Sequence, residues 1–453
     1  MNHQDTAAKA NIATAKRAAI HTLGCRLNHS ESALLEQKLE AEGYQLVPFG
    51  ERADLAIVNT CTVTEHADAK SRKAVRGFIR ENPGAYVAVI GCYAQTGPES
   101  VAGIAGVDLV VGTQEKLNVL DYVAHGKQAA PLIVRDRLDR DDFSIEVPAG
   151  GAPIVDRVNL KIQDGCDFMC SFCIIPFARG RARSRALDNL LQEAQSLVAR
   201  GAKELVLTGV NIGTYDWEGE SVLRVVEALS GIEGLARIRI SSIEPTTIPD
   251  ELFQWMADPA HTLTPYLHIP LQAGSDNTLQ AMRRRYGRSE FLEFVHRADQ
   301  CVPGIGIGTD ILVGFPGETE ADFEATCDVL WRSPLFYAHV FKYSERPGTA
   351  AVRMPGKVPP TVMQERSARL RVLSAKKTRM FLEHHVGQTV EVLFEHVEGG
   401  YWMGYTGSYL RVGVRDDGVN LKNQLGTMVV RQVVGDVGVG ELVGTAGYMP
   451  SRT

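Results

Sequence analysis

The chain has 453 residues, of which 44% are hydrophobic and 23% are charged, and its formal net charge is −6 at pH 7. This length is too great for one ordinary domain, so we expect two or three, each able to bury a full core. The acidic balance excludes a surface that is basic throughout, so any contact with nucleic acid must come from a local patch.

Residues 1–16 are polar and rich in alanine and lack the apolar stretch of a signal peptide, so we expect a disordered tail. No segment has the roughly 18 uninterrupted apolar residues of a membrane span. Together these features predict a cytoplasmic protein with no membrane partner. In that reducing compartment the eight cysteines are expected to be metal ligands, catalytic thiols or core residues rather than disulfides.

Residues 17–126 alternate short β-branched runs with stretches of helical periodicity. This alternation predicts an N-terminal α/β domain with a parallel sheet covered by helices on both faces. The predicted strands are residues 18–24, 55–60, 86–91 and 107–113.

A cysteine follows each of the first three predicted strands, namely Cys25, Cys61 and Cys92. The carboxyl ends of parallel strands form the edge at which open α/β sheets bind ligands, so the repeated placement predicts one shared site. The alternative is three buried core cysteines, which are common individually.

Residues 127–151 are rich in proline, glycine and charge and predict a linker. In residues 152–384, strand signals separated by helical stretches predict a partial (β/α)6 barrel, whose active site lies at the carboxyl ends of its strands. The six strand signals are residues 157–163, 204–209, 237–242, 266–271, 305–314 and 337–343.

Residues 385–449 contain short alternating strands with glycine turns, which predict a small antiparallel β-barrel. A basic helix through residues 366–379 precedes it and is either an RNA contact or a solvated face. Residues 385–453 hold five Lys/Arg and seven Asp/Glu, so RNA binding by this barrel would depend on a local patch or on stacking by aromatic side chains, which can equally form its core. Those aromatic residues are Tyr401, Trp402, Tyr405 and Tyr409.

Cys166, Cys170 and Cys173 follow the first predicted strand of the central barrel. A tetrahedral zinc site takes a fourth ligand, and iron–sulfur cubanes also normally take four thiolates. Three thiolates would leave one iron open for a small molecule. The spacing Cys-x3-Cys-x2-Cys at this position resembles the radical S-adenosylmethionine superfamily, which implies a [4Fe–4S] cluster whose open iron is chelated by S-adenosylmethionine.

Further motifs, in order along the chain, resemble the methylthiotransferase family. They are "TLGCRLNHSES", "VNTCTVTEHADAKSR", "VIGCYAQ", "DGCDFMCSFCIIPFARGRARSR", "LTGVNIG", "HIPLQAGSD", "TDILVGFPGET" and "FKYSERPGTAA". The resemblance runs from about residue 18 to about residue 447. It implies a second [4Fe–4S] cluster on Cys25, Cys61 and Cys92, and a C-terminal RNA-binding barrel of the TRAM type.

Members of this family insert a methylthio group at an unactivated C–H bond, and "TLGCRLN" is closest to the enzymes that act on N6-threonylcarbamoyladenosine at position 37 of tRNA, 3′ of the anticodon. The enzymes for isopentenyladenosine typically carry Gln-Met-Asn where this chain has Arg26, Leu27 and Asn28. Isopentenyladenosine in tRNA and an aspartate of a ribosomal protein remain alternative substrates. A non-catalytic, metal-dependent RNA-binding protein is the alternative of another class.

The polar and glycine residues after the second, third and fourth barrel strands are predicted to bind S-adenosylmethionine, and the arginines after the cysteine loop are predicted to bind RNA phosphates or the carboxylate of the cofactor. The resemblance adds tRNA and an electron donor such as flavodoxin or ferredoxin as partners, and it leaves the sulfur donor open. The cofactor residues are Thr208, Gly209, Asn211, Ser242, Glu244 and Gln272, and the arginines are Arg179, Arg181, Arg183 and Arg185.

Overall fold

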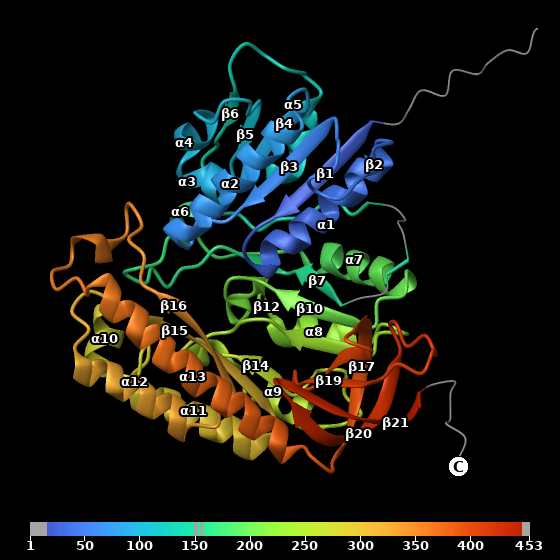
Figure 1. The fold of residues 1–453 in the computed structure, drawn as a ribbon, viewed down its shortest axis with the longest axis vertical. Coiled ribbons are helices and arrows are strands. Elements are labelled where there is room, and N and C mark those ends of the chain that lie inside the picture. Colours follow the sequence, from blue (N-terminus) through green and yellow to red (C-terminus); the bar gives the residue numbers. More distant parts are fainter. Residues whose placement is uncertain (1–15, 149–152, 155–156, 446–453) are drawn as a thin grey trace, which may run out of the picture.

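The computed structural model describes residues 16–148, 153–154 and 157–445. It consists of an N-terminal α/β domain, a central α/β domain and a C-terminal β-barrel, with the first and last at opposite ends of the molecule (Figure 1). Apart from Lys16, the predicted tail lies outside the described residues. No described helix is long and apolar enough to cross a membrane.

The N-terminal domain contains the predicted parallel sheet, in the order β2-β1-β3-β4-β5-β6. All six residues of β3 are buried, as expected for a strand covered by helices on both faces. Apolar cores lie on the two sides of the sheet. The strands are β1 Arg17–Thr22, β2 Gln45–Leu46, β3 Leu55–Thr60, β4 Tyr86–Gly91, β5 Leu109–Val111 and β6 Leu132–Val134.

The helices of this domain lie between the strands. The side chain of Thr64 accepts a hydrogen bond from the amide of Ala67 and so fixes the start of α2. The helices are α1 Arg26–Ala41, α2 Glu65–Glu81, α3 Cys92–Thr96, α4 Pro98–Ala102 and α5 Val119–Val123, with a 3₁₀ turn, η1, at Lys116–Asn118.

Strand β6 falls within the segment predicted to be a linker. Its three apolar residues pair in parallel with β5, beginning with Leu132 opposite Leu109. An apolar triplet gains burial and backbone hydrogen bonds by extending the edge of a sheet, so residues 132–134 belong to the N-terminal domain. The linker prediction is wrong for these residues.

The central domain is the predicted partial barrel, with six parallel strands following one another in chain order. They form two three-stranded sheets, β7-β10-β13 and β14-β15-β16, which an isolated parallel bridge between Ile238 and Leu263 connects. The strands are β7 Val158–Lys161, β10 Glu204–Thr208, β13 Arg237–Ile240, β14 Tyr266–His268, β15 Gly306–Val313 and β16 Tyr337–Lys342.

Helices cover the outside of the partial barrel, and one large apolar core lies between them and the strands. The helices are α7 Leu187–Ala199, α8 Val222–Ser230, α9 Glu251–Ala257, α10 Asp276–Ala281, α11 Arg288–Cys301, α12 Glu320–Arg332 and α13 Pro360–His384. Smaller elements near the first strand are β8 Gln163–Asp164, α6 Ile175–Ala178 and β9 Arg183–Ser184, and β11 Asp216–Trp217 pairs with β12 Glu220–Ser221.

The C-terminal domain is a closed barrel in the order β17-β18-β19-β21-β20. Four of its neighbouring pairs are antiparallel, as predicted, and the pair β19 and β21 is parallel. The strands are β17 Thr389–Glu398, β18 Tyr401–Thr406, β19 Arg411–Arg415, β20 Leu425–Val434 and β21 Val437–Thr445.

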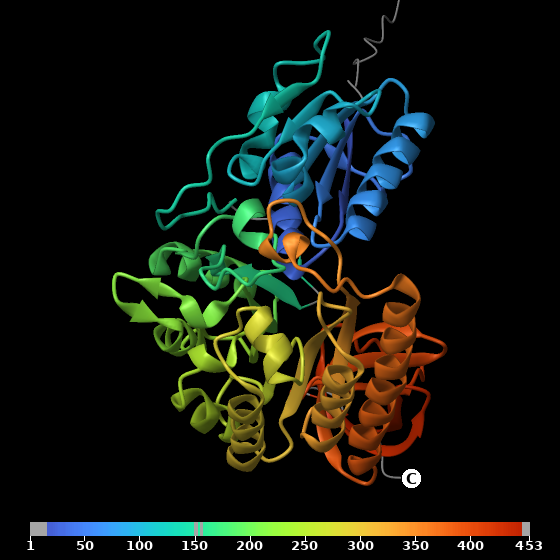
Figure 2. The same ribbon diagram turned by 90° about the vertical axis from the view of Figure 1, so that its left-hand side faces the viewer.

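The turn between β18 and β19 docks onto the central domain, and in Figure 2 the C-terminal barrel lies behind α13. The buried guanidinium of Arg239 pairs with Glu204 and donates hydrogen bonds to the carbonyls of Thr406 (3.1 Å) and Gly407 (2.7 Å). A Cβ at Gly306, where β15 begins, would lie 2.0 Å from the carbonyl oxygen of Ser408. Glycine is therefore required for this approach of two backbones.

The substitution Gly306→Ala is expected to separate the C-terminal barrel from the central domain. The added methyl group overlaps a backbone atom and should cost about 1–3 kcal/mol. The measurements are the thermal unfolding midpoint and the rate of proteolytic cleavage between α13 and β17. Gly77→Ala is the control, because a Cβ there meets no atom within 4 Å, and equal sensitivity of the two variants would contradict the prediction.

Candidate functional site

The three N-terminal cysteines lie at the carboxyl ends of adjacent strands. Cys25 follows β1 and immediately precedes α1, Cys61 follows β3, and Cys92 is the first residue of α3, directly after β4. A Cβ at Gly24, whose φ is +105°, would lie 2.9 Å from the Sγ of Cys61. The turn that carries Cys25 therefore packs directly against Cys61.

Two side chains connect the three strand ends. The Nδ2 of Asn28 donates to the carbonyls of Leu23 (2.6 Å) and Thr60 (3.0 Å). The hydroxyl of Thr60 donates to the carbonyl of Ile90 (2.6 Å) and accepts from the amide of Tyr93 (3.2 Å). Sequence reasoning missed both roles, because the partners are up to 33 positions away.

The thiols of this group differ in exposure, since Cys25 is exposed while Cys61 and Cys92 are buried. Burial raises the pKa of Cys61 to about 12, and the neighbouring thiols of Cys92 and Cys25 act in the same direction. Burial also raises the pKa of Cys92, against the opposing charges of Arg179 and Lys116. Thiolates here are therefore costly unless a metal centre takes up their charge.

The second group of cysteines lies on a loop that folds back on itself after β8. Gly165 has φ +70°, and a Cβ there would lie 1.9 Å from the carbonyl oxygen of Arg181. The amide of Cys166 donates to the carbonyl of Gly180 at 3.1 Å. Both contacts hold the start of the cysteine loop against the segment that follows α6.

Arg284 is the cation of this second group, and sequence reasoning did not select it. Its Nη1 donates to the Sγ of Cys170 at 3.2 Å, and its Nη2 pairs with the carboxylate of Glu244. Burial raises the pKa of Cys166 to about 11 and that of Cys173 to about 12, and the charge of Arg284 opposes the increase at Cys173. The run of three arginines at residues 283–285 was the available signal.

Both groups fit a thiolate-bound iron–sulfur cluster by the chemistry of their donors. Each has three thiols and a guanidinium with a buried side chain beside them, Arg179 for the first group and Arg284 for the second. In the described part of the chain, no group of three or more His, Cys, Asp or Glu side chains is arranged to hold a single metal ion. The thiolates of a cubane bind different iron atoms, so they need not converge on one point as the ligands of a single ion do.

A buried cluster of charges joins the two domains between the cysteine groups, and we call it the Glu31 network. Glu31 of α1 accepts from Lys116 (2.5 Å), Lys161 (2.8 Å) and Arg179 (3.1 Å). Asp164 accepts from Lys161 (2.6 Å) and Arg179 (3.0 Å). Lys116 and Glu31 belong to the N-terminal domain and the other three to the central domain.

The network contains three cations and two carboxylates, so it carries a net positive charge next to the thiols. Burial by itself raises the pKa of Glu31, but the charges of Arg179, Lys116 and Lys161 outweigh it and hold the pKa well below its usual range. Arg179 lies close enough to influence both Cys61 and Cys92. The guanidinium of Arg179 therefore favours the thiolate form of the N-terminal cysteines and also pairs with Asp164, two residues before Cys166.

A second contact between the domains lies beside Cys61. Arg346, from the loop after β16, donates to Asp68 (2.6 Å) and to the hydroxyl of Thr62 (2.7 Å). The amide of Glu65, the first residue of α2, donates to the Oγ of Ser344 in the same loop. The N-terminal domain is thus held on both sides of its thiol group.

The four arginines after the cysteine loop are predicted to bind RNA phosphates or the carboxylate of the cofactor, and three of them are too buried for the first of these roles. Arg179, Arg183 and Arg185 are buried, with 0%, 7% and 0% of their surface exposed. Arg185 pairs with Glu193, and Arg183 donates to the side chain of Gln114. These side chains hold the fold together, which the alternation of arginines in the sequence does not reveal.

Arg181 is the exception, since about half of its side chain is exposed, and it pairs with Asp167 at 2.6 Å.

The predicted basic helix is part of α13, and several of its basic side chains bind neighbouring protein groups. Arg366 and Arg369 pair with acidic residues in and before α12, and Lys377 donates to the carbonyl of Ser333. A solvated or structural face describes these residues better than an RNA contact.

The predicted cofactor residues lie at or after the carboxyl ends of β10, β13 and β14, at the same end of the partial barrel as the cysteine loop. Thr208 is buried, and its hydroxyl donates to the carbonyl of Val206. A Cβ at Gly209 would lie 2.8 Å from the Oε1 of Gln163 and 2.8 Å from Ile212. Gly209 therefore makes room for protein atoms, and its contact with the cofactor stays a prediction.

Asn211 is the predicted cofactor residue with a free donor. Its Oδ1 accepts from the amide of Glu244 and the hydroxyl of Thr247, but its buried Nδ2 has no partner among the described residues. Ser242 is partly exposed at the same edge. Gln272 has φ +65°, which turns the chain sharply at the end of β14. These residues remain available to a ligand at this edge.

Three of the four aromatic residues named for the C-terminal barrel pack against protein. Trp402 belongs to the barrel core, and Tyr405 and Tyr409 stack on each other with ring centroids 4.9 Å apart. Tyr409 also lies 4.7 Å from the ring of Tyr266 in the central domain. Only Tyr401 of the four is exposed, so stacking on RNA bases is not available to the other three in this arrangement.

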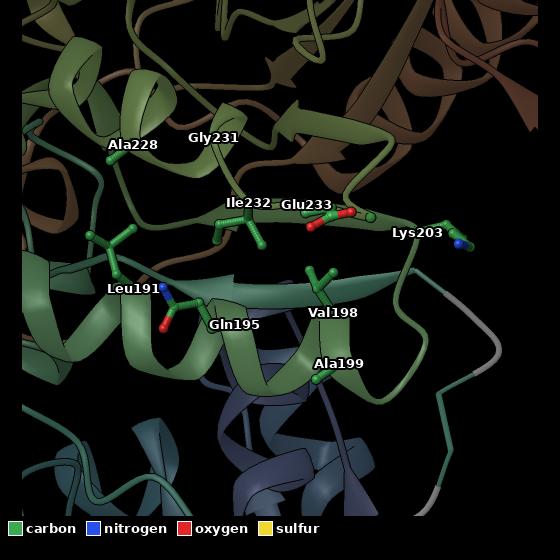
Figure 3. A pocket seen from close by; sticks show the side chains of 10 residues that line it. Leu191, Gln195, Val198, Ala199, Lys203, Ala228, Gly231, Ile232 and Glu233 are labelled. Carbon is green, nitrogen blue, oxygen red and sulfur yellow. The ribbon is translucent and has the colours of Figure 1, made fainter.

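A surface pocket elsewhere lies between α7 and the loop after α8 (Figure 3). Side chains such as Leu191, Val198 and Ile232 line it, and none of the predicted site residues does. It lies on the outside of the partial barrel, away from the cysteine groups.

Comparisons with known proteins agree with this division of the chain. Residues 17–112 match the family described as Uncharacterized protein family UPF0004, and residues 160–330 match the Radical SAM superfamily. A solved radical S-adenosylmethionine methyltransferase, TsrM from Kitasatospora setae, shares the fold with a TM-score of 0.52 and 16% identity over 72% of this chain and 75% of that one. The fold and the cysteine loop thus define a radical S-adenosylmethionine enzyme.

The curated relatives narrow the class further. The Bacillus subtilis protein named Threonylcarbamoyladenosine tRNA methylthiotransferase MtaB is 38% identical over 87% of this chain and 89% of its own length. A Cereibacter sphaeroides protein named tRNA-2-methylthio-N(6)-dimethylallyladenosine synthase is 36% identical over 85% of this chain and 88% of its own. The chain belongs to the methylthiotransferase family and is a transferase.

The substitution Glu31→Gln is expected to destabilise the holoenzyme by about 3–5 kcal/mol, because it leaves buried cations without their carboxylate. The lowered pKa means that the contribution of Glu31 is complete above its unfolded pKa of about 4.3 and declines as the pH falls further. The unfolding midpoint should therefore depend less steeply on acid in the variant. Glu40→Gln, at an exposed position of the same helix, is the control, and comparable losses in both variants would refute the role of the network.

Proposed function

We propose that this enzyme is a tRNA methylthiotransferase that converts N6-threonylcarbamoyladenosine at position 37 to its 2-methylthio derivative, using S-adenosylmethionine and two [4Fe–4S] clusters. The observation that carries the proposal is the pair of three-cysteine groups, at strand ends of two domains that one buried charge network joins. The name of the Bacillus subtilis relative supports the choice of nucleoside.

In this proposal Cys166, Cys170 and Cys173 hold the cluster that binds S-adenosylmethionine, which supplies radical chemistry when bound. Arg284 donates to the thiolate of Cys170 and is itself held by Glu244. The unpartnered Nδ2 of Asn211 gives the cofactor a buried hydrogen-bond donor. The protein's part is to bind and orient the cofactor and to keep cationic charge beside the thiolates.

Cys25, Cys61 and Cys92 hold the second cluster, at which the sulfur for the product is handled. With three protein thiolates, the cluster would supply a binding position for an external sulfur species, whose donor the chain does not indicate. Arg179 keeps a fixed positive charge beside these thiolates. An external reductant, such as flavodoxin or ferredoxin, supplies electrons.

The basic face of α2 replaces the buried arginines as the proposed contact with the RNA backbone. A shallow groove along this helix is lined by Arg72, Lys73, Arg76 and Arg80. The last three are exposed, and the spacing of the four along the helix puts them on one face. A local basic stripe on an acidic protein is what contact with phosphates requires.

The second candidate is the isopentenyl (dimethylallyl) nucleoside, because the Cereibacter sphaeroides relative is nearly as similar as that from Bacillus subtilis. The two substrates differ only in the group on N6 of the adenine. Sequence identity to the relatives does not distinguish the two candidate substrates, whereas the modified nucleosides found in cellular tRNA do.

A strain that lacks this gene is expected to accumulate N6-threonylcarbamoyladenosine and to lose its 2-methylthio derivative from tRNA. Restoring the gene should restore the derivative. The measurement is liquid chromatography with mass spectrometry of digested tRNA. Loss of 2-methylthio-isopentenyladenosine instead would favour the second candidate, and unchanged tRNA nucleosides would refute both.

We expect the two groups of cysteines to be needed for different steps of the reaction. Cys170→Ala is expected to abolish formation of 5′-deoxyadenosine, whereas Cys61→Ala should abolish methylthio product but retain 5′-deoxyadenosine, because its cysteine group belongs to another domain. The assay is anaerobic, with reductant, S-adenosylmethionine and modified tRNA. Iron analysis should find about eight iron atoms per chain in the wild type and about four in each variant.

Cys301→Ala is the control for both variants, because Cys301 is exposed at the end of α11 and remote in sequence from either group. It should retain both products and the full iron content. Methylthio product at normal yield from Cys61→Ala would show that the N-terminal cysteines do not handle sulfur. Stoichiometric zinc without sulfide would refute the iron–sulfur assignment as a whole.

A further inference from the structure

Arg26, the residue after Cys25, is a cation without an anion. Its Nη2 donates to the hydroxyl of Tyr409 at 2.9 Å, and its guanidinium lies 5.7 Å from the centre of that ring. No carboxylate of the described residues forms an ion pair with it. A guanidinium has five N–H donors, so most of the hydrogen-bonding capacity of this partly buried side chain is unused.

The other arginines around Tyr409 are neutralised. Arg157 lies 5.3 Å and Arg239 4.9 Å from the centre of the Tyr409 ring. Arg157 pairs with Glu395, and Arg239 pairs with Glu204. Arg26 is therefore the excess positive charge where the N-terminal domain, the central domain and the C-terminal barrel meet.

The strands next to this junction present polar side chains on the face opposite the outer helices. In β16, Ala338 and Val340 are buried, and α13 covers their side of the strand, where the Oγ of Ser374 accepts from the amide of Ala338. Since strand side chains alternate, Tyr337 and His339 point to the inside of the partial barrel. His339 is nevertheless exposed, so solvent reaches this inner face.

The carboxylate of Asp310, next to this junction on the inner face, already has a partner. Asp310 of β15 pairs with the Nε2 of His268 at 3.1 Å, and the Nδ1 of His268 lies 3.1 Å from the hydroxyl of Tyr337. Partial desolvation of its ring lowers the pKa of His339, and the charges of His268 and Arg26 act in the same direction. Among the described residues, the inner face near Arg26 thus offers hydrogen-bonding groups and an unpaired cation, while the carboxylate of Asp310 is already paired.

The N-terminus of helix α1 adds to the positive electrostatic potential around Arg26. It has 16 residues, carries no acidic residue in its first turn and has no side-chain cap at Cys25. The dipole of such a helix favours an anion at its N-terminus. Arg26 and the first turn of α1 therefore favour the same kind of ligand.

We propose that Arg26 binds the carboxylate of the threonyl group of the substrate nucleoside. This inference rests on the proposed function, in which Cys25 holds the cluster beside the reacting adenine, so that the residue next to Cys25 lies within reach of the substituent on the base. The threonylcarbamoyl group carries a carboxylate and a hydroxyl. Guanidinium and carboxylate form a planar, charge-assisted pair, and His339 and Tyr409 offer polar groups for the hydroxyl. An uncharged alkenyl substituent would leave Arg26 without a partner.

The test uses two anticodon stem-loop RNAs, one with N6-threonylcarbamoyladenosine at position 37 and one in which the threonyl carboxylate is converted to the neutral carboxamide. The holoenzyme is expected to bind the acid about ten- to a hundred-fold more tightly than the amide, measured by fluorescence anisotropy. Arg26→Gln should reduce this ratio to about one by weakening only the acid, and Arg26→Lys should retain part of it. The KM for the acid should rise in Arg26→Gln while the KM for S-adenosylmethionine stays unchanged.

Arg332→Gln is the matched control, because Arg332 is an exposed arginine on α12 that pairs with Asp328 of its own helix, and it should keep the wild-type ratio. An unchanged ratio in Arg26→Gln, or equal weakening of both RNAs, would overturn the inference while wild-type turnover of the acid RNA upholds the proposed function. A rise in the KM for S-adenosylmethionine instead would assign Arg26 to the cofactor and also overturn it. No methylthiolation of the acid RNA by the wild type would overturn both proposals.

Discussion

The fully buried carboxylate of Glu31 is the constraint on which the arrangement of this enzyme depends. Removing a carboxylate and its cations from water is costly, and the cost is recovered only when every charge has a well-placed partner. Here Lys116, Lys161 and Arg179 provide those partners from separate parts of the chain. The N-terminal domain therefore has one position on the central domain that satisfies the network, and that position brings the two groups of thiols into the same part of the molecule.

Buried ion pairs, of this network and beside it, explain why arginines next to the cysteine loop are unavailable to RNA. Arg179 is held by Glu31 and Asp164, and Arg185 by Glu193. Arg179 has two roles, as a connection between domains and as positive charge beside thiols that burial would otherwise keep protonated. Arg284 performs the corresponding task for the cysteine loop of the central domain. For contact with the substrate we propose other groups, namely the basic face of α2 and the unpaired Arg26.

The C-terminal barrel has a structural role that its amino-acid composition does not indicate. Carbonyl groups of the turn between β18 and β19 accept hydrogen bonds from Arg239, and Tyr409 reaches from this turn to Arg26 and Tyr266. The turn thus lies where all three domains meet, beside the inner face of the partial barrel. A barrel with few basic residues is consistent with this position, because much of its contact surface faces protein.

The sequence by itself determined the main strands of the two α/β domains and the placement of all six cysteines after strands, because hydrophobic periodicity and glycine turns are local properties of the chain. It also supported the partial barrel and the closed C-terminal barrel. Only the tertiary structure decided which charges are paired. Arg179 and Glu31 are 148 positions apart, and Arg26 and Tyr409 are 383 apart. The pattern of arginines in a segment does not reveal whether a carboxylate from another domain will meet them. The burial of Arg179, Arg183 and Arg185, the contact of Arg284 with Cys170, the packing at Gly209 and the isolation of Arg26 all follow from how domains dock, which no local pattern encodes.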